Sequence, residues 1–185
     1  SYGDNPNGNK ADDCPNESGG SFEDRQGCKD SDNDGWSNPD VIWTMDDGAD
    51  ALPDNPTQWS DFDGDGYGDN YGNHSWTMTR DESWPGEYVL LALNQDACPL
   101  QYGDSSLGEI LGCTDKDGDG WADFIDAFPD DVNEYLDSDK DGFADGTDDC
   151  RNTKGGSQND RKGCPDLDGD GWSDADAMWT IGNGA

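Results

Sequence analysis

The chain has 185 residues, of which only 30% are hydrophobic, against about 45–50% in an ordinary globular domain, so a large hydrophobic core is excluded. It carries 44 acidic residues against 10 Lys and Arg, a formal net charge of -34. This charge excludes nucleic acid as a partner, because phosphates are also negative. Intrinsic disorder is the alternative for so acidic a chain, but aromatic residues and regularly placed Asp residues oppose it.

Tandem copies of one unit are predicted along the chain. The first unit covers 1–66, an insertion follows at 67–97, a second unit covers 98–149, and a partial unit covers 150–185. The first two units each combine a couple of Cys residues with two Asp-rich loops. The insertion holds the only dense apolar run, 88–93, which is far shorter than the about 20 residues needed to cross a bilayer. We therefore expect no membrane insertion.

The repeat is most evident between the two ends of the chain. A shift that carries Cys14 onto Cys150 also carries Trp36 onto Trp172 and needs no gap. The last copy stops at Ala185, within its unit, so we expect the chain to be a window of a longer tandem array, with a capping repeat as the alternative. Because it begins without Met or a signal peptide, we expect a processed form or a fragment.

Six Cys residues fall into three couples with spacings of 14, 15 and 14 positions. Six Cys allow fifteen pairings, among which sequence alone cannot choose, but the near-constant spacing makes pairing within each couple the simplest choice. A zinc site is the alternative, yet no CxxC pair occurs and His74 is the sole histidine. Disulfides imply an oxidising compartment, so we expect a secreted, extracellular or cell-surface protein. The couples are Cys14 and Cys28, Cys98 and Cys113, and Cys150 and Cys164.

Five segments share the pattern Asp-x-Asp-x-Asp-Gly, followed by an aromatic residue. Calcium takes six to eight oxygen ligands, which alternate Asp residues supply, while Gly at position six permits a sharp turn and position seven offers its carbonyl oxygen. We expect Ca²⁺, about five ions or more, rather than Mg²⁺, which demands a tighter octahedron. The ligands predicted at positions one, three, five and seven are Asp30, Asp32, Asp34 and Trp36; Asp61, Asp63, Asp65 and Tyr67; Asp115, Asp117, Asp119 and Trp121; Asp137, Asp139, Asp141 and Phe143; and Asp166, Asp168, Asp170 and Trp172.

Acidic residues farther along each loop are predicted to complete the coordination shells. They stand at position nine, eleven or twelve when the first Asp is counted as one. No loop has the closing Glu of an EF-hand at position twelve, and no apolar-periodic helices flank the loops, which argues against an EF-hand pair. These residues are Asp69, Asp123, Asp145 and Asp174 at nine, Asp40 and Asp176 at eleven, and Asp126 and Asp148 at twelve.

The segment 137–150 reads DSDKDGFADGTDDC and resembles the thrombospondin type 3 repeat, whose pattern is DxDxDGxxDxxDxC. The other loops match the first half of that pattern, and Cys14-Pro15 and Cys98-Pro99 are similar to its Cys-Pro step. The resemblance covers most of the chain except about 71–96. It implies an irregular chain wound around a row of calcium ions and cross-linked by disulfides, in secreted matrix or surface proteins.

The predicted fold class is an irregular, metal-organised tandem repeat. Asp, Gly and Pro favour turns, so we expect little regular secondary structure beyond short strands, with calcium loops and disulfides in place of a large core. Trp36, Trp121 and Trp172 recur at one loop position and are expected to pack between the loops as a miniature core. A sugar-binding platform is their alternative role. Two sequons predict N-glycosylation at Asn16 and Asn73.

The function predicted from these features is structural. Each bound ion would remove backbone freedom and cancel local repulsion, so that the chain becomes a stiff segment of an extracellular fibre, stalk or surface protein. The expected partners are copies of the chain itself or neighbouring repeats in a polymer. An adhesive module that binds a glycan or a matrix protein in a calcium-dependent manner is the alternative. No nucleophile elbow, P-loop or dinucleotide motif occurs in the sequence, so we do not expect an enzyme.

Overall fold

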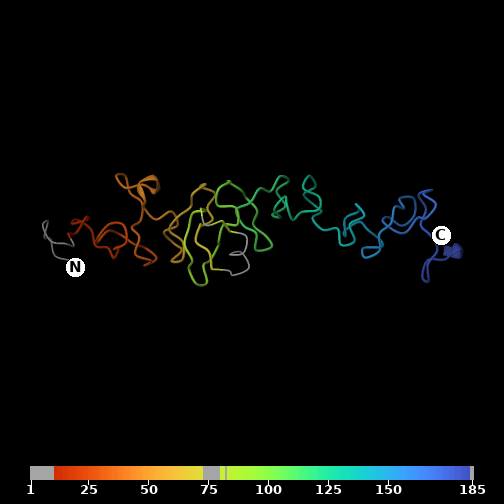
Figure 1. Ribbon diagram of the computed structural model, residues 1–185, viewed down its shortest axis with the longest axis horizontal. Helices are drawn as coiled ribbons and strands as arrows, with labels where there is room; N and C mark the ends of the chain where they lie inside the picture. The colour runs from red at the N-terminus through yellow and green to blue at the C-terminus, as the bar shows by residue number, and fades with distance from the viewer. Residues whose placement is uncertain (1–10, 73–79, 82, 184–185) are drawn as a thin grey trace. The chain divides into compact units, whose positions relative to one another are not determined.

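The computed structural model describes residues 11–72, 80–81 and 83–183 (Figure 1). These residues form no α-helix and no sheet; the only helices among them are two 3₁₀ turns, η1 (Met45–Asp47) and η2 (Ile181–Asn183). Strand pairing is reduced to isolated parallel bridges, such as Tyr71 with Tyr88. The prediction of little regular secondary structure is therefore confirmed. No helix in the described part of the chain is long and apolar enough to cross a membrane.

The chain separates into two compact units, Ser1–Thr114 and Asp115–Ala185. The first contains two of the Asp-rich loops, one disulfide loop on each side of them, and the apolar run 88–93. That run does not form a core, because Leu90, Leu91 and Leu93 are largely exposed. The second compact unit contains three Asp-rich loops and one disulfide loop.

The buried interior of the described residues is polar. Its apolar members are small, namely Cys and Ala residues and Pro99, and its largest fully buried side chains are Gln58, Asn70, Asp50, Asp69 and Asp96. Buried amides satisfy one another: Gln58 donates to the carbonyl oxygen of Asn70 and accepts from its N–H group at 2.8 Å. Hydrogen bonds and carboxylates thus occupy the places that aliphatic side chains fill in an ordinary domain.

Three disulfides close loops of near-equal length, in the pairing that the spacing favours. A buried serine lies inside each loop, and its Oγ accepts a hydrogen bond from the N–H group of the second cysteine, so the loop is braced across its middle. The disulfides join Cys14 to Cys28, Cys98 to Cys113, and Cys150 to Cys164, and the serines are Ser21, Ser105 and Ser157.

An arginine clamp near the start of the chain stabilises the segment that follows the first Asp-rich loop. The Arg25 guanidinium donates from Nε to Ser37 Oγ at 2.9 Å, from Nη1 to Asp40 at 2.7 Å and from Nη2 to the Asn38 carbonyl at 3.2 Å. It also lies over the ring of Trp43, 5.6 Å from the centroid. These contacts need no metal ion.

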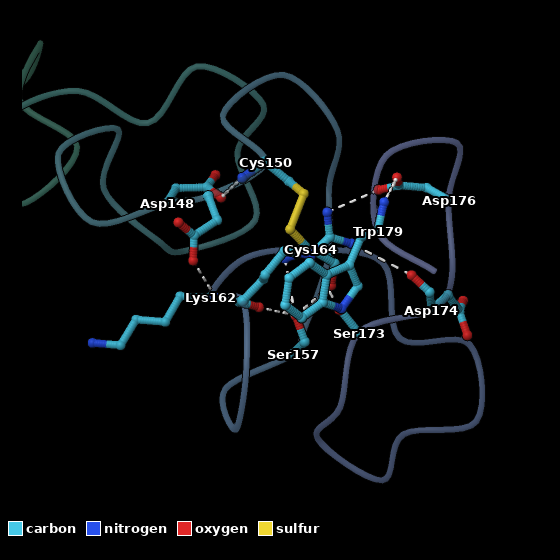
Figure 2. Close-up of a disulfide and its surroundings, with 12 residues drawn as sticks. Asp148, Cys150, Ser157, Lys162, Cys164, Ser173, Asp174, Asp176 and Trp179 are labelled. Atoms are coloured by element: carbon cyan, nitrogen blue, oxygen red, sulfur yellow. Dashed lines mark hydrogen bonds and ion pairs between the residues drawn. A yellow bond between two sulfur atoms is a disulfide. The ribbon is translucent and has the colours of Figure 1, made fainter. Parts of the chain in front are cut away.

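The clamp recurs at the other end of the chain. Arg161 donates to Ser173 Oγ at 3.2 Å and to Asp176 at 2.8 Å, and lies 5.2 Å from the ring centroid of Trp179 (Figure 2). The Trp179 indole N–H donates to Asp160 at 3.2 Å. Burial alone would raise the pKa of Asp160, but hydrogen bonds from Ser173 and Trp179 outweigh it and lower the pKa to about 2.

Replacing the clamp arginine tests its contribution to stability. We expect Arg25→Ala to lower the free energy of unfolding by about 2–3 kcal/mol, because charge-assisted hydrogen bonds to a largely buried guanidinium are lost. Chemical denaturation followed by tryptophan fluorescence measures this change. Arg151→Ala, at an exposed position, is the control, with an expected loss below about 1 kcal/mol. Equal losses in the two variants would contradict the clamp.

Candidate metal centres

Each Asp-rich loop is organised by its own backbone N–H groups. In the first loop, Asp30 accepts from Asn33 N at 2.7 Å and from Gly35 N at 3.1 Å through its two oxygens. Asp34 accepts from Trp36 N at 2.8 Å through Oδ1. The carboxylate at position one therefore fixes the turn, while oxygens at positions three and five remain available.

The same hydrogen bonds recur in the other four loops. Position one accepts from the Gly N–H at position six at 2.9, 2.7, 2.9 and 2.8 Å in the loops that begin at Asp61, Asp115, Asp137 and Asp166. The glycines at position six have φ between 91° and 103° across the five loops. Only glycine adopts this backbone conformation without strain, which explains its place in the pattern.

The carboxylates of a triplet converge. One oxygen from each of three Asp residues lies within 4.8 Å of the others in each of four triplets. No hydrogen bond between described residues reaches the carbonyl oxygen at position seven in any of the five loops, so this oxygen remains available as a ligand. The four triplets are Asp30, Asp32 and Asp34; Asp61, Asp63 and Asp65; Asp115, Asp117 and Asp119; and Asp137, Asp139 and Asp141.

Asp50 faces the first triplet from outside its loop. It is fully buried, its Oδ1 accepts from Leu52 N at 2.8 Å, and its Oδ2 has no hydrogen-bond partner. Burial, followed by repulsion from Asp34 and Asp32, raises its pKa to about 7. Asp50 was not among the predicted ligands.

Asp96 stands in the same relation to the second triplet, and it was also missed. It is 1% exposed, its Oδ2 has no partner, and burial, then repulsion from Asp65 and Asp63, raises its pKa to about 8. Asp69, predicted at position nine, is equally buried with neither oxygen hydrogen-bonded, and burial raises its pKa. This centre gathers five carboxylates.

Asp126 and Asp148, predicted at position twelve, face the third and fourth triplets. Burial raises both pKa values, and repulsion from the Asp residues of the respective triplet raises them further. Each accepts the N–H of the second residue after it, at 2.7 and 2.6 Å. We call Asp50, Asp96, Asp126 and Asp148 the closing carboxylates.

A short sequence signal identifies the closing carboxylates that were missed. Three of the four closing carboxylates, the two missed ones included, begin an Asp-Ala-x-Pro tetrapeptide, at 50–53, 96–99 and 126–129. The fourth begins Asp-Asp-Cys-Arg at 148–151. The shared feature is a carboxylate that caps the backbone two residues later, which aims its second oxygen away from that turn. The number of residues from the triplet varies, so counting positions along each loop found Asp126 and Asp148 but not Asp50 or Asp96.

Other predicted ligands lie elsewhere. Asp40 and Asp176 contact the clamp arginines and accept backbone N–H groups, which lowers both pKa values; the structure does not bring them to the triplets. At position nine, Asp123, Asp145 and Asp174 accept the N–H at position two, at 2.8, 2.8 and 3.1 Å, and brace the loop. The acidic residues at position eleven and these three at position nine therefore have structural roles of their own, which their hydrogen bonds explain.

The fifth loop is the most open. Asp166 makes the shared hydrogen bonds, but Asp168 and Asp170 are exposed, whereas the corresponding residues of the other loops are half-buried. Trp172 is also 51% exposed and does not join a core. Trp121 by contrast stacks on Tyr135, with centroids 4.5 Å apart.

The unpartnered oxygens show that the first four centres fit a metal ion. Buried polar atoms in native proteins almost always have a partner, yet Oδ2 of Asp32, Asp63, Asp117 and Asp139 and of three closing carboxylates has none among the described residues. Negative oxygens in such close groups repel one another unless a cation lies between them. These centres can hold a metal ion through oxygen atoms alone, because all six cysteine sulfurs are in disulfides.

No family model matches the chain, and no curated protein sequence matches it. The remaining predicted sites are the two sequons. Asn16 is exposed in the turn that follows Cys14, and Asn73 lies outside the described residues.

The raised pKa values predict how the metal-free chain responds to pH. Asp34, Asp50 and Asp96 have pKa values of about 6, 7 and 8 when folded, against 3.8 ordinarily. The folded state therefore holds protons that the unfolded chain has released, so stability is greatest near pH 4 and falls as the pH rises toward about 8. Thermal melting of resin-treated protein measures this.

A charge-matched pair of variants assigns the effect. Asp96→Asn should reduce the slope of melting temperature against pH, whereas Asp46→Asn, which removes an exposed charge, should not. A metal-free melting temperature that rises between pH 5 and pH 8 would show the opposite sign and contradict the assignment.

Proposed function

We propose that this chain is a calcium-stabilised structural segment of an extracellular fibre, stalk or surface protein, similar to thrombospondin type 3 repeats, and that it is not an enzyme. The observation that carries the proposal is the set of buried carboxylate oxygens that converge without hydrogen-bond partners. A bound divalent cation supplies the positive charge and the coordination that these oxygens lack.

The donor set favours calcium over other divalent ions. Every candidate ligand is a carboxylate or carbonyl oxygen, and thiolate or imidazole ligands, which suit zinc and copper, are absent from these loops. The number of oxygens per centre also fits the six to eight that calcium takes, with water completing the shell. Magnesium keeps most of its own water and needs fewer carboxylates than the five gathered around Asp96.

A structural role is supported by what lies inside the molecule. The carboxylates of Asp50 and Asp96 occupy the interior and do not line the hollow described below. Ions bound there would therefore hold separate turns together, and the expected partners are copies of the chain or neighbouring repeats. The three disulfides fit the oxidising extracellular setting in which calcium is abundant.

A hollow in the first compact unit favours adhesion as a second candidate function. It has a volume of about 580 Å³ and is lined by Trp36 and Trp59, which stack with centroids 6.1 Å apart, together with Asp61 and Glu87. Aromatic faces beside carboxylates suit a glycan. Calcium-dependent binding on a glycan array would favour this function over a purely structural one.

Removing calcium tests the leading proposal. We expect chelation to loosen the chain, because repulsion among the buried carboxylates is no longer balanced, and calcium to restore it at about 10⁻⁴–10⁻³ M. Far-ultraviolet circular dichroism and protease resistance measure the change, with magnesium as the control ion. A chain that is equally resistant with and without chelator would overturn the proposal.

Two Asp residues of the first unit provide a matched test of the ligands. Asp50→Asn should weaken one calcium site by about 10–100-fold, because it replaces a buried carboxylate that faces the triplet. Asp40→Asn should leave the number of ions unchanged and lower stability through Arg25. Calorimetric titration counts the ions. If Asp40→Asn removes an ion and Asp50→Asn does not, the assignment of ligands is wrong.

A further inference from the structure

We propose that two of the three disulfides are working parts of the metal centres that precede them, so that metal binding and disulfide stability are coupled at those two places. Cys98–Cys113 is assigned to the centre at Asp61, Asp63 and Asp65, and Cys150–Cys164 to the centre at Asp137, Asp139 and Asp141. This inference rests on the proposed calcium function and adds a redox dependence to it.

The Cys150–Cys164 loop supplies three elements to its centre, and Figure 2 shows the disulfide together with the closing carboxylate Asp148. Cys150 N donates to Oδ1 of the closing carboxylate Asp148 at 2.6 Å, which leaves Oδ2 free. Gly155 N donates to Asp141 Oδ2 at 2.9 Å, from inside the disulfide loop. Gly163, next to Cys164, has φ +68°, and a Cβ there would collide with the Asp148 carboxylate.

The Cys98–Cys113 loop repeats these contacts at the other centre. Cys98 N donates to Asp96 Oδ1 at 2.6 Å, and Gly103 N donates to Asp65 Oδ2 at 3.2 Å. Gly112, with φ +72°, lies against both carboxylates, since a Cβ there would overlap Asp96 Oδ1 and come 2.8 Å from Asp65 Oδ2. In each loop the disulfide joins the cysteine that orients the closing carboxylate to the cysteine that follows the glycine packed against that carboxylate.

The remaining loops provide internal comparisons. The closing carboxylates Asp50 and Asp126 are oriented by Leu52 N and Phe128 N, in turns without a disulfide. The Cys14–Cys28 loop orients Asp12, which no Asp-x-Asp-x-Asp triplet precedes in the sequence. Its Gly27 nevertheless has φ +75°, and a Cβ added there would lie 2.8 Å from Asp12 Oδ1. It is therefore the same arrangement of cysteine, glycine and carboxylate without an Asp-x-Asp-x-Asp triplet before it in the sequence.

The coupling has a simple physical origin. A closed loop holds the N–H donors and the closing carboxylate in one arrangement, whereas a reduced loop must pay the entropy of ordering them when an ion binds. Outer hydrogen bonds of this kind change metal affinity by about 10–100-fold. Because coupling between two equilibria is reciprocal, bound calcium must stabilise these two disulfides by the same factor.

The first experiment measures disulfide stability in glutathione buffers, with and without saturating calcium, by alkylation and mass spectrometry of the full chain. Each disulfide takes up two electrons and two protons as two glutathione molecules become one glutathione disulfide. We expect calcium to shift the reduction equilibria of Cys98–Cys113 and Cys150–Cys164 by at least about tenfold, and that of Cys14–Cys28 by much less. Equal shifts for all three, or none, would overturn the inference.

The second experiment keeps every disulfide and tests the glycines. Gly112→Ala and Gly163→Ala should each weaken one calcium site by at least about tenfold, whereas Gly27→Ala, with the same backbone strain at the matching place, should leave the number of ions unchanged. Calorimetric calcium titration reads out each variant. Loss of an ion in Gly27→Ala, or full binding in the other two, would contradict the assignment.

The two proposals fail differently. If the oxidised wild-type chain binds no calcium in the titration, the proposed function is wrong and the coupling has no basis. If the wild-type chain binds its ions normally but its disulfides respond to calcium alike, only the coupling is wrong.

Discussion

Repulsion among aspartate carboxylates that the chain holds close together is the constraint on which the rest of the structure depends. Local hydrogen bonds cause this close approach. Backbone N–H groups at positions four and six orient the first Asp and bend the loop so that three carboxylates converge. A closing carboxylate such as Asp50 or Asp96 then enters each of the first four centres from outside the loop and adds to the charge. Among the described residues no aliphatic interior opposes this repulsion, and a cation held between the carboxylates would balance it.

The remaining interactions hold the segments between the centres, and they need no ion. Buried serines brace the disulfide loops, and the arginine clamps join Arg25 to Asp40 and Arg161 to Asp176. The clamp contacts are charge-assisted and partly screened from water, so they are strong for polar interactions. The molecule thus combines fixed polar crosslinks with centres whose stability depends on the solution around them.

Several features of this arrangement were predictable because they depend on residues close together in the sequence. The Asp-x-Asp-x-Asp-Gly pattern contains the whole turn, including the glycine whose positive φ permits it, and cysteines 14 or 15 positions apart are near enough to favour one pairing. Composition alone excluded an aliphatic core. The tryptophans were harder to place: Trp121 stacks on Tyr135, but Trp172 at the same loop position is half exposed, since its neighbours differ.

Only the tertiary structure decided which later carboxylates face which triplet. Counting along the loop suggested Asp40 and Asp176, yet an arginine 15 residues earlier in the chain engages each of them instead. Asp50 and Asp96 reach their centres after intervening segments of different length, so neither stands at a fixed number of residues from its triplet. The sequence by itself determined the turns and the kind of donor atom, because those are local properties. Completing the first two centres required the fold, because Asp50 and Asp96 reach their triplets only where the chain returns.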